Sequence, residues 1–364
     1  MTPKRILLVS GARPNFMKIA PLWRAFKDLG GRFIPILLHT GQHYDDAMSG
    51  AFFRDLGLPK PAVDLGVGSD SHAGQTAKVM VGFEREVERM KPHAVLVVGD
   101  VNSTLACALV CSKMGVPLGH VEAGLRSYDR SMPEEANRVV TDALATWLFT
   151  PSPDADRNLL AEGIPKSRIF RVGNIMIDSL VAARKRAASS RIAGRLGLSG
   201  KRFALLTLHR PSNVDGLEAL RKIWKAIETL SKEVPVVFPV HPRTRNSLKR
   251  FGLKNGHGVL LTEPLGYLDF LHLEERAAVV LTDSGGVQEE TTYFGVPCLT
   301  LRENTERPIT VEQGTNEVVG TVPVRILTMA RKALRGEWKK GRRPWGWEGR
   351  TANRIAAQMA KEVK

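Results

Sequence analysis

Three acidic residues in the first half of the sequence could carry out general acid–base chemistry. Asp100 and Glu122 lie at the ends of two short apolar runs, and Glu134 lies beyond the loop that follows Glu122. Carboxylates that crowd into one cleft raise one another's pKa, so one can act as a base and another as an acid near neutral pH. The alternative is helix capping by Asp100, and by Glu134 together with Ser131, since those two have the spacing of a capping box.

A glycine turn in the second half has the composition of a phosphate site. Residues 282–290 read TDSGGVQEE, which predicts a strand end, a turn and the first turn of a helix. Glycines let a phosphate approach the backbone, and the first N–H groups of the helix then face it. A turn that needs glycine only for its geometry is the alternative. A second glycine loop with Arg13, followed by Lys18, favours phosphate binding, and His209 could bind phosphate or move a proton.

No sequence signature indicates a cofactor. Neither a P-loop GxxxxGK[ST] nor a dinucleotide-binding GxGxxG occurs, which counts against nicotinamide chemistry. Histidines of the right type for zinc are present, but none has HxxxH or HExxH spacing: His39, His43, His120, His209 and His241. We therefore expect no cofactor and no metal.

The elements that must position these groups are short apolar runs alternating with amphipathic segments. We expect strands at residues 5–10, 33–39, 94–98, 119–122, 147–150 and 169–172, and then at 203–208, 236–240, 259–261, 278–282, 297–301 and 318–321. Helices are expected at residues 15–29, 75–90, 134–147 and 217–232. This alternation is typical of parallel α/β sheets, which bind ligands beyond the carboxyl ends of their strands.

The strand rhythm is interrupted near residues 187–200, a basic stretch rich in Ala, Ser and Arg. We interpret this stretch as a linker between two Rossmann-like domains, which fits better than a single eight-stranded barrel. The expected domains are residues 1–172 and 178–345, with a terminal helix at residues 351–364 that crosses back onto the first domain.

Composition narrows the remaining possibilities. The chain has 364 residues, 43% hydrophobic and 25% charged, which is ordinary for a globular protein. No apolar run approaches a membrane span, and three cysteines without a CxxC motif argue against a disulfide framework. We therefore expect a cytoplasmic protein without a membrane partner.

The net charge of +16 would attract nucleic acids or phosphorylated substrates. Seven Lys and Arg residues without an acid lie in residues 181–202, and eight against two acids lie in residues 331–350, interleaved with tryptophans. No RRM, KH or helix-turn-helix signature accompanies them. We interpret both stretches as solvated surface and expect no nucleic-acid partner.

Taken together, the motifs strongly resemble the non-hydrolysing UDP-N-acetylglucosamine 2-epimerases. The matching segments run nearly end to end: GARP at 11–14 with Lys18, TGQH at 40–43, VGD at 98–100 with NST at 102–104, HVEAGLR at 120–126, PEEANR at 133–138, LHR at 208–210, HP at 241–242, TDSGGVQEE at 282–290 and TERP at 305–308. The HVEAGLR and DSGGxQEE segments are highly specific in combination.

The resemblance implies a two-domain fold of the glycosyltransferase B type, with two Rossmann-like domains facing across a cleft, and a homodimer. It implies inversion at C2 of UDP-N-acetylglucosamine to give UDP-N-acetylmannosamine, by anti elimination of UDP to a glycal and syn re-addition, without a nicotinamide or metal. Asp100, Glu122 and Glu134 match the catalytic carboxylates and His209 the cleft histidine. The remaining site positions match residues that bind the nucleotide sugar: Arg13, Lys18, Arg210, His241, Phe270, Ser284, Gly285, Gly286, Glu290 and Arg307.

Some positions depart from the pattern. Ala12 stands where Thr is usual, and Asn15 where Glu is usual. Gln42, Arg210 and His241 match positions associated with a second, allosteric substrate site in many bacterial members. Tyr44 and Ser212 differ from those members.

Four alternative functions stay open. They are a hydrolysing epimerase that releases N-acetylmannosamine and UDP, an epimerase of a 3-acetamido or uronic acid UDP-sugar, a retaining glycosyltransferase of the same architecture, and a nucleic-acid-binding protein. A retaining glycosyltransferase would not need three acids at these strand ends.

Overall fold

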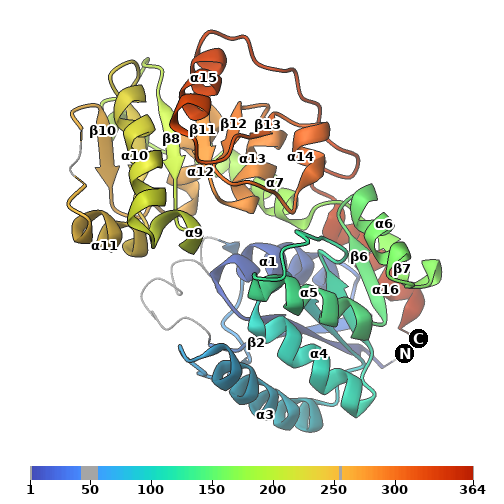
Figure 1. Cartoon of the computed structure of the whole chain (residues 1–364). Coiled ribbons are helices and arrows are strands. Elements are labelled where there is room, and N and C mark those ends of the chain that lie inside the picture. The colour runs from blue at the N-terminus through green and yellow to red at the C-terminus, as the bar shows by residue number, and fades with distance from the viewer. Residues whose placement is uncertain (1, 42–55, 254–255, 364) are drawn as a thin grey trace. The chain divides into compact units, whose positions relative to one another are not determined.

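A computed structural model describes residues 2–41, 56–253 and 256–363 (Figure 1). The chain forms two compact units. The first unit contains Met1–Ser179 and Trp345–Lys364, and the second contains Leu180–Pro344. Helix α7 (Ile175–Ala188) contains the first boundary between them.

The first unit is built on a seven-stranded sheet with the order β3-β2-β1-β4-β5-β6-β7, in which every neighbouring pair is parallel. Its strands are β1 (Lys4–Ser10), β2 (Phe33–His39), β3 (Val63–Asp64), β4 (Ala94–Val98), β5 (Leu118–Val121), β6 (Trp147–Thr150) and β7 (Ile169–Arg171). Its helices include α1 (Arg13–Lys27), α3 (His72–Met90), α4 (Asn102–Met114), α5 (Pro133–Leu144), α6 (Pro153–Ala161) and α16 (Thr351–Glu362). The continuous apolar runs of the central strands are buried, as both faces of a parallel sheet require.

The second unit has a six-stranded parallel sheet with the order β10-β9-β8-β11-β12-β13. Its strands are β8 (Ala204–Thr207), β9 (Val236–Pro239), β10 (Val259–Thr262), β11 (Val279–Thr282), β12 (Cys298–Thr300) and β13 (Asn316–Val318). Its helices include α8 (Ile192–Arg195), α9 (Pro211–Val214), α10 (Leu217–Leu230), α11 (Pro242–Arg250), α12 (Tyr267–Arg276), α13 (Gly285–Phe294), α14 (Pro308–Glu312) and α15 (Pro323–Leu334). Two parallel sheets with alternating helices confirm the expected Rossmann-like fold class.

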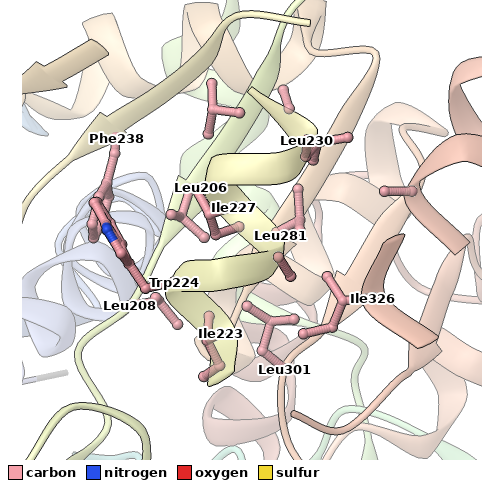
Figure 2. Packing of buried hydrophobic residues seen from close by; sticks show 14 of the residues in the cluster. Leu206, Leu208, Ile223, Trp224, Ile227, Leu230, Phe238, Leu281, Leu301 and Ile326 are labelled. Carbon is pink, nitrogen blue, oxygen red and sulfur yellow. The ribbon is translucent and has the colours of Figure 1, made fainter. Parts of the chain in front are cut away.

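The main core of the second unit lies between its sheet and helix α10 (Figure 2). Trp224 on α10 is almost fully buried, and its ring centroid lies 6.3 Å from that of Phe238 on β9. Ile223, Ile227 and Leu230 follow on the same buried face of the helix. Helix α10 is therefore anchored by its apolar face. Each large apolar side chain that is fully buried there stabilises the fold by about 2–3 kcal/mol.

The two basic stretches are mostly exposed, as expected of solvated surface, and both contain helix. Residues 187–200 contain the end of α7 and all of α8, with turn residues after each helix. The second stretch contains the end of α15 and a segment that is anchored by specific contacts. Trp338 donates a hydrogen bond to the Thr315 carbonyl (2.8 Å), and Arg343 lies over the Tyr293 ring, 4.0 Å from its centroid.

The terminal helix α16 belongs to the first unit, where it contacts α1. Asp178 accepts hydrogen bonds from the N–H groups of Thr351 (3.1 Å) and Ala352 (2.8 Å), the first two residues of α16. One carboxylate thus caps the start of the helix. Within the described ranges, no helix has the length and apolar character needed to cross a membrane.

Candidate active site

Asp100 follows β4 in the first unit and is held by two residues of helix α5. Arg138 donates to Asp100 Oδ2 (2.6 Å), and the Asn137 amide donates to the Asp100 carbonyl (2.9 Å). The N-cap residue of α4 is Val101, which makes no side-chain capping bond. The Asp100 side chain is 31% exposed, so its carboxylate is accessible as well as paired with Arg138.

Glu122 comes directly after the neighbouring strand β5, so it and Asp100 lie at the same edge of the sheet, where Val98 pairs with Val121. Its φ is 75°, a left-handed conformation that is unusual for a residue other than glycine. The buried Lys18 forms an ion pair with its carboxylate. The ammonium group of Lys18 is therefore paired with Glu122, one of the three candidate acids. Gly99 has a φ of 67°, a left-handed conformation that favours glycine, and an added Cβ would lie 2.8 Å from the Lys18 ammonium nitrogen.

Glu134 lies in the first turn of α5, half-buried. The alternative reading, a capping box with Ser131, does not hold, because the helix begins at Pro133 with Met132 as its N-cap and Ser131 donates to Asp129 (2.6 Å). Proline has its favoured position at the first helical residue, which fixes this start. The carboxylate of Glu134 makes no hydrogen bond within the part of the chain that the structure describes.

The neighbouring Glu135 is a residue that sequence reasoning did not single out. Its carboxylate accepts hydrogen bonds from the N–H of Ser127 (3.0 Å), the Ser127 hydroxyl (2.8 Å) and the N–H of Tyr128 (2.9 Å), and it also pairs with Arg138. Burial raises its pKa, but these hydrogen bonds and Arg138 outweigh burial, so the pKa lies below its usual value. Glu135 anchors the loop between Glu122 and Glu134.

Asn15, where the family usually has Glu, closes the first glycine loop. Its side-chain oxygen accepts from the N–H groups of Gly11 (3.0 Å) and Ala12 (2.8 Å), and its amide donates to the Val98 carbonyl (3.1 Å). Arg13 begins α1, and its side chain lies outside what the structure describes. Gln42, His43 and Tyr44 also lie outside the described residues.

His209 follows β8 in the second unit and is oriented by a buried carboxylate. Its Nδ1 lies 2.9 Å from Asp283 Oδ1, and Asp283 also accepts from the backbone N–H groups of His209 and Arg210. Burial alone would raise the Asp283 pKa, but the hydrogen bond and charge of His209, together with these N–H groups, lower it. The His209 side chain is 40% exposed, so the ring can reach a ligand. His241 caps α11, and its ring centroid lies 6.0 Å from that of His209.

Near the glycine turn, three arginines form ion pairs with the two buried carboxylates of Glu306 and Glu289. Arg302 donates to Glu306 Oε2 (2.7 Å), and Arg210 to Glu306 Oε1 (3.3 Å), while Arg307 pairs with Glu289 (2.5 Å). Burial raises the pKa of Glu306, but the charges of Arg307, Arg302 and Arg210 outweigh it and lower the pKa to about 2. In the sequence Glu306 is only one residue of the TERP motif, and it lies 96 residues from Arg210, so sequence reasoning could not pair the two.

The glycine turn itself forms the start of α13, as expected. Ser284 is the N-cap and makes no side-chain capping bond, and Gly285 and Gly286 open the helix. A Cβ on Gly285 would lie 3.0 Å from Glu306 Oε1, so glycine is needed for this close approach. The first N–H groups of α13 can therefore bind an anion.

Glu290 lies one turn further along α13 and is buried beside Tyr267, whose hydroxyl donates to it (2.9 Å). Burial raises the Glu290 pKa to about 7, against the lowering effect of Tyr267 and Glu274. Phe270 on α12 is half-buried and packs on the apolar cluster of that helix. Within the described residues, no group of three or more His, Cys, Asp or Glu side chains could hold a metal ion.

Comparisons with known proteins agree on one family. The family described as UDP-N-acetylglucosamine 2-epimerase matches residues 28–360. A relative of that name from Methanococcus maripaludis is 43% identical and covers 91% of this chain and 92% of its own length. A UDP-2,3-diacetamido-2,3-dideoxy-D-glucuronate 2-epimerase from Pseudomonas aeruginosa is 41% identical, covering 98% and 99%.

Solved structures agree with this result. The crystal structure of the Methanocaldococcus jannaschii UDP-GlcNAc 2-epimerase in complex with UDP-GlcNAc and UDP matches with a TM-score of 0.90 and 40% identity, over 98% of this chain and 99% of that one. A glycosyltransferase of kitacinnamycin matches with a TM-score of 0.59 and 14% identity, which shows a shared fold only. The chain therefore belongs to the UDP-N-acetylglucosamine 2-epimerase family.

Proposed function

We propose that this protein interconverts UDP-N-acetylglucosamine and UDP-N-acetylmannosamine, by elimination of UDP to a glycal and re-addition. The observation that carries the proposal is the placement of the acids. Asp100 and Glu122 follow adjacent strands at one sheet edge, and Glu134 opens the helix whose Arg138 holds Asp100. This set of carboxylates suits proton transfer at a sugar carbon.

In the elimination, one of these carboxylates removes the C2 proton while the C1–O bond to the diphosphate breaks. The electron pair of the C2–H bond forms the C1=C2 double bond, and the electrons of the C1–O bond leave with UDP. In the return step, a proton is added to C2 from the opposite face and the UDP oxygen attacks C1 again. Because the C2 proton is only weakly acidic, stabilisation of departing UDP must supply much of the rate enhancement.

We assign that stabilisation to the second unit. The N–H groups at the start of α13, Ser284 and the arginines on Glu306 and Glu289 are the donors, with His209 oriented by Asp283. Glu290 and Phe270 are assigned to the ribose and the uracil, and Arg13, Lys18 and His241 complete the binding set. The two units, with boundaries near residues 179 and 345, are proposed as the acid-bearing and nucleotide-binding domains.

Proton NMR of the protein with UDP-N-acetylglucosamine in deuterated buffer tests this function. We expect deuterium at C2 in intact UDP-sugar of both configurations. Free N-acetylmannosamine with UDP would replace the proposal by a hydrolysing epimerase, and an unchanged substrate would overturn it.

A modified UDP-sugar is the second candidate substrate. The Pseudomonas aeruginosa relative is named for UDP-2,3-diacetamido-2,3-dideoxy-D-glucuronate and covers 98% of this chain. Parallel assays with both UDP-sugars, compared by kcat/KM, decide between them.

We also propose a cytoplasmic homodimer. The three cysteines of the described chain, Cys107, Cys111 and Cys298, are free and buried, which suits a reducing compartment. Light scattering at the concentration of the activity assay measures the oligomeric state.

A further inference from the structure

A buried charged network lies directly behind the proposed acids. His120 is fully buried on β5. Its Nδ1 lies 2.6 Å from Asp142 Oδ1, and its Nε2 lies 2.8 Å from the carbonyl oxygen of Gly99. Both partners are oxygen atoms, so both ring nitrogens of His120 are engaged by the protein and the ring orientation is fixed.

Asp142, on helix α5, is the hub of this network. Its second oxygen accepts from the N–H of Gly124 (3.0 Å) and from Arg126 (2.8 Å), and Arg126 also pairs with Glu162 (2.6 Å). Burial raises the Asp142 pKa, but the charges and hydrogen bonds of His120 and Arg126 outweigh it and hold the pKa below its usual value. Asp142 is thus held by the His120 ring, the Arg126 guanidinium and a backbone N–H, which together satisfy a buried carboxylate.

The network is hydrogen-bonded to the backbone just before Asp100 and just after Glu122. Through His120 it holds Gly99, which precedes Asp100, and through Asp142 it holds Gly124, two residues after Glu122. Gly99, Glu122 and Gly124 all have left-handed φ values, of 67°, 75° and 80°. Such a conformation is unfavourable for a residue other than glycine, and at Glu122 it persists only because the surroundings hold it.

We propose that His120 and Asp142 are positioning residues, which fix the backbone of Asp100 and Glu122 so that both carboxylates keep the geometry needed for proton transfer. Neither side chain can touch the substrate, because both are fully buried. They act only through the backbone of the loops that contain Gly99–Asp100 and Glu122–Gly124. The kinetic part of the inference rests on the proposed function.

Asp142→Asn is the primary variant. Misplacement of a catalytic group by about 1 Å can cost on the order of 100-fold, so we expect kcat to fall by about 10- to 100-fold with KM for UDP-N-acetylglucosamine within about threefold. The matched control is Asp156→Asn, a carboxylate of the same unit whose hydrogen bonds go to Thr150 and Arg171 and not to His120, Asp142 or Arg126. The control should keep kcat.

Hydrogen exchange of the same variants gives a readout that does not depend on turnover. The N–H of Gly99 donates to the Val121 carbonyl (3.1 Å) and that of Glu122 to the Phe149 carbonyl (3.0 Å). Peptides covering residues 96–104 and 119–127 should exchange at least about tenfold faster in Asp142→Asn than in the wild type. Their exchange rates should not change in Asp156→Asn. This result would stand even if the wild-type protein acted on another UDP-sugar.

A double-mutant cycle with His120→Asn completes the test. Because both residues act through one network, the double variant should lose little more activity than the worse single variant. The proposal is overturned by a native kcat in Asp142→Asn, by a rise in KM that accounts for the loss, by unchanged exchange, or by multiplicative losses in the cycle.

Discussion

Glu134 and Glu135 are adjacent in sequence but differ in their surroundings. Glu135 is buried and receives three hydrogen bonds from Ser127 and Tyr128, whereas Glu134 is half-buried in the first turn of the same helix. A carboxylate that is held on all sides serves structure, and one that keeps free acceptors can take a proton from a ligand. Within one helical turn, Glu135 therefore has the surroundings of a structural residue and Glu134 those of a residue that can transfer a proton.

Substitution of the two residues should separate activity from stability. We expect Glu134→Gln to lower kcat by about 10²–10⁴-fold with an unchanged melting temperature, as for loss of a general acid or base. Glu135→Gln should instead lower the melting temperature, since a buried charge network is broken. Steady-state kinetics and thermal melts of both variants check this, and native turnover in Glu134→Gln would return that residue to a structural role.

Glu306 makes a pH-dependent contribution to stability. Its pKa of about 2 lies below the usual 4.5, so its contribution is present above about pH 4.5 and is lost as the pH falls through about 2. This difference corresponds to about 3 kcal/mol. The melting temperature of Glu306→Gln should lie below that of the wild type at pH 6, and the gap should shrink as the pH falls from 5 to 3. The exposed Glu303→Gln in the same loop serves as control.

At the scale of elements, the start of α13 joins the glycine turn to the arginine cluster. Gly285 has no positive φ, so the reason for glycine there lies in the space beside it, where an added Cβ would lie 3.0 Å from Glu306 Oε1. A methyl group at this position would crowd a carboxylate that orients Arg210. A substitution at the start of α13 should therefore also disturb the arginine cluster on Glu306.

Gly285→Ala should weaken UDP binding by about tenfold or more, because charge-assisted contacts to the diphosphate are displaced. Binding of uridine, which lacks phosphate, should change little. Calorimetry with both ligands measures the difference. Gly266→Ala is the matched control, since that glycine begins α12 with nothing near its added Cβ. Equal losses for UDP and uridine would contradict the phosphate assignment.

Strands were the elements most readily predicted from sequence. The expected runs at 94–98 and 147–150 coincide with β4 and β6, because central strands of a parallel sheet are continuously apolar. Strand β3 has only Val63–Asp64 and gives no such signal. The acids and the glycine turn could be found because they follow strands. Their partners could not: Asp142 lies 22 residues from His120 and Glu306 lies 96 from Arg210, and only folding brings them together.

At the scale of the whole molecule, the first unit depends on the C-terminal helix. Asp178 caps α16, and Trp347 is buried just before that helix. The basic segment before it is anchored in the second unit by Trp338 and Arg343. The end of the chain is therefore an integral part of both units.

Asp178→Ala should loosen α16. Loss of a capping carboxylate costs about 0.5–2 kcal/mol, and here two N–H groups lose their acceptor. We expect a lower melting temperature and faster hydrogen exchange of residues 351–362. Asn353→Ala, on the exposed side of the same helix, should change neither.

The surplus positive charge can be tested with the exposed residues alone. Lys340 and Arg342 are exposed, whereas Lys339 pairs with Glu317 (3.1 Å) and Arg343 packs on Tyr293. Changing Lys340 and Arg342 to Glu should leave KM within about threefold, because exposed charges beyond roughly 8–10 Å are screened. Sub-micromolar, salt-sensitive RNA or DNA binding that these changes abolish would show a nucleic-acid role.

The division of the chain at residues 179 and 345 has a consequence for its synthesis. The second unit is encoded as one uninterrupted stretch and can fold as soon as it has left the ribosome. The first unit begins earlier but lacks α16 until residues 351–362 have been translated. The half that is started first is thus finished last, and a truncated message would yield an intact second unit attached to an incomplete first one.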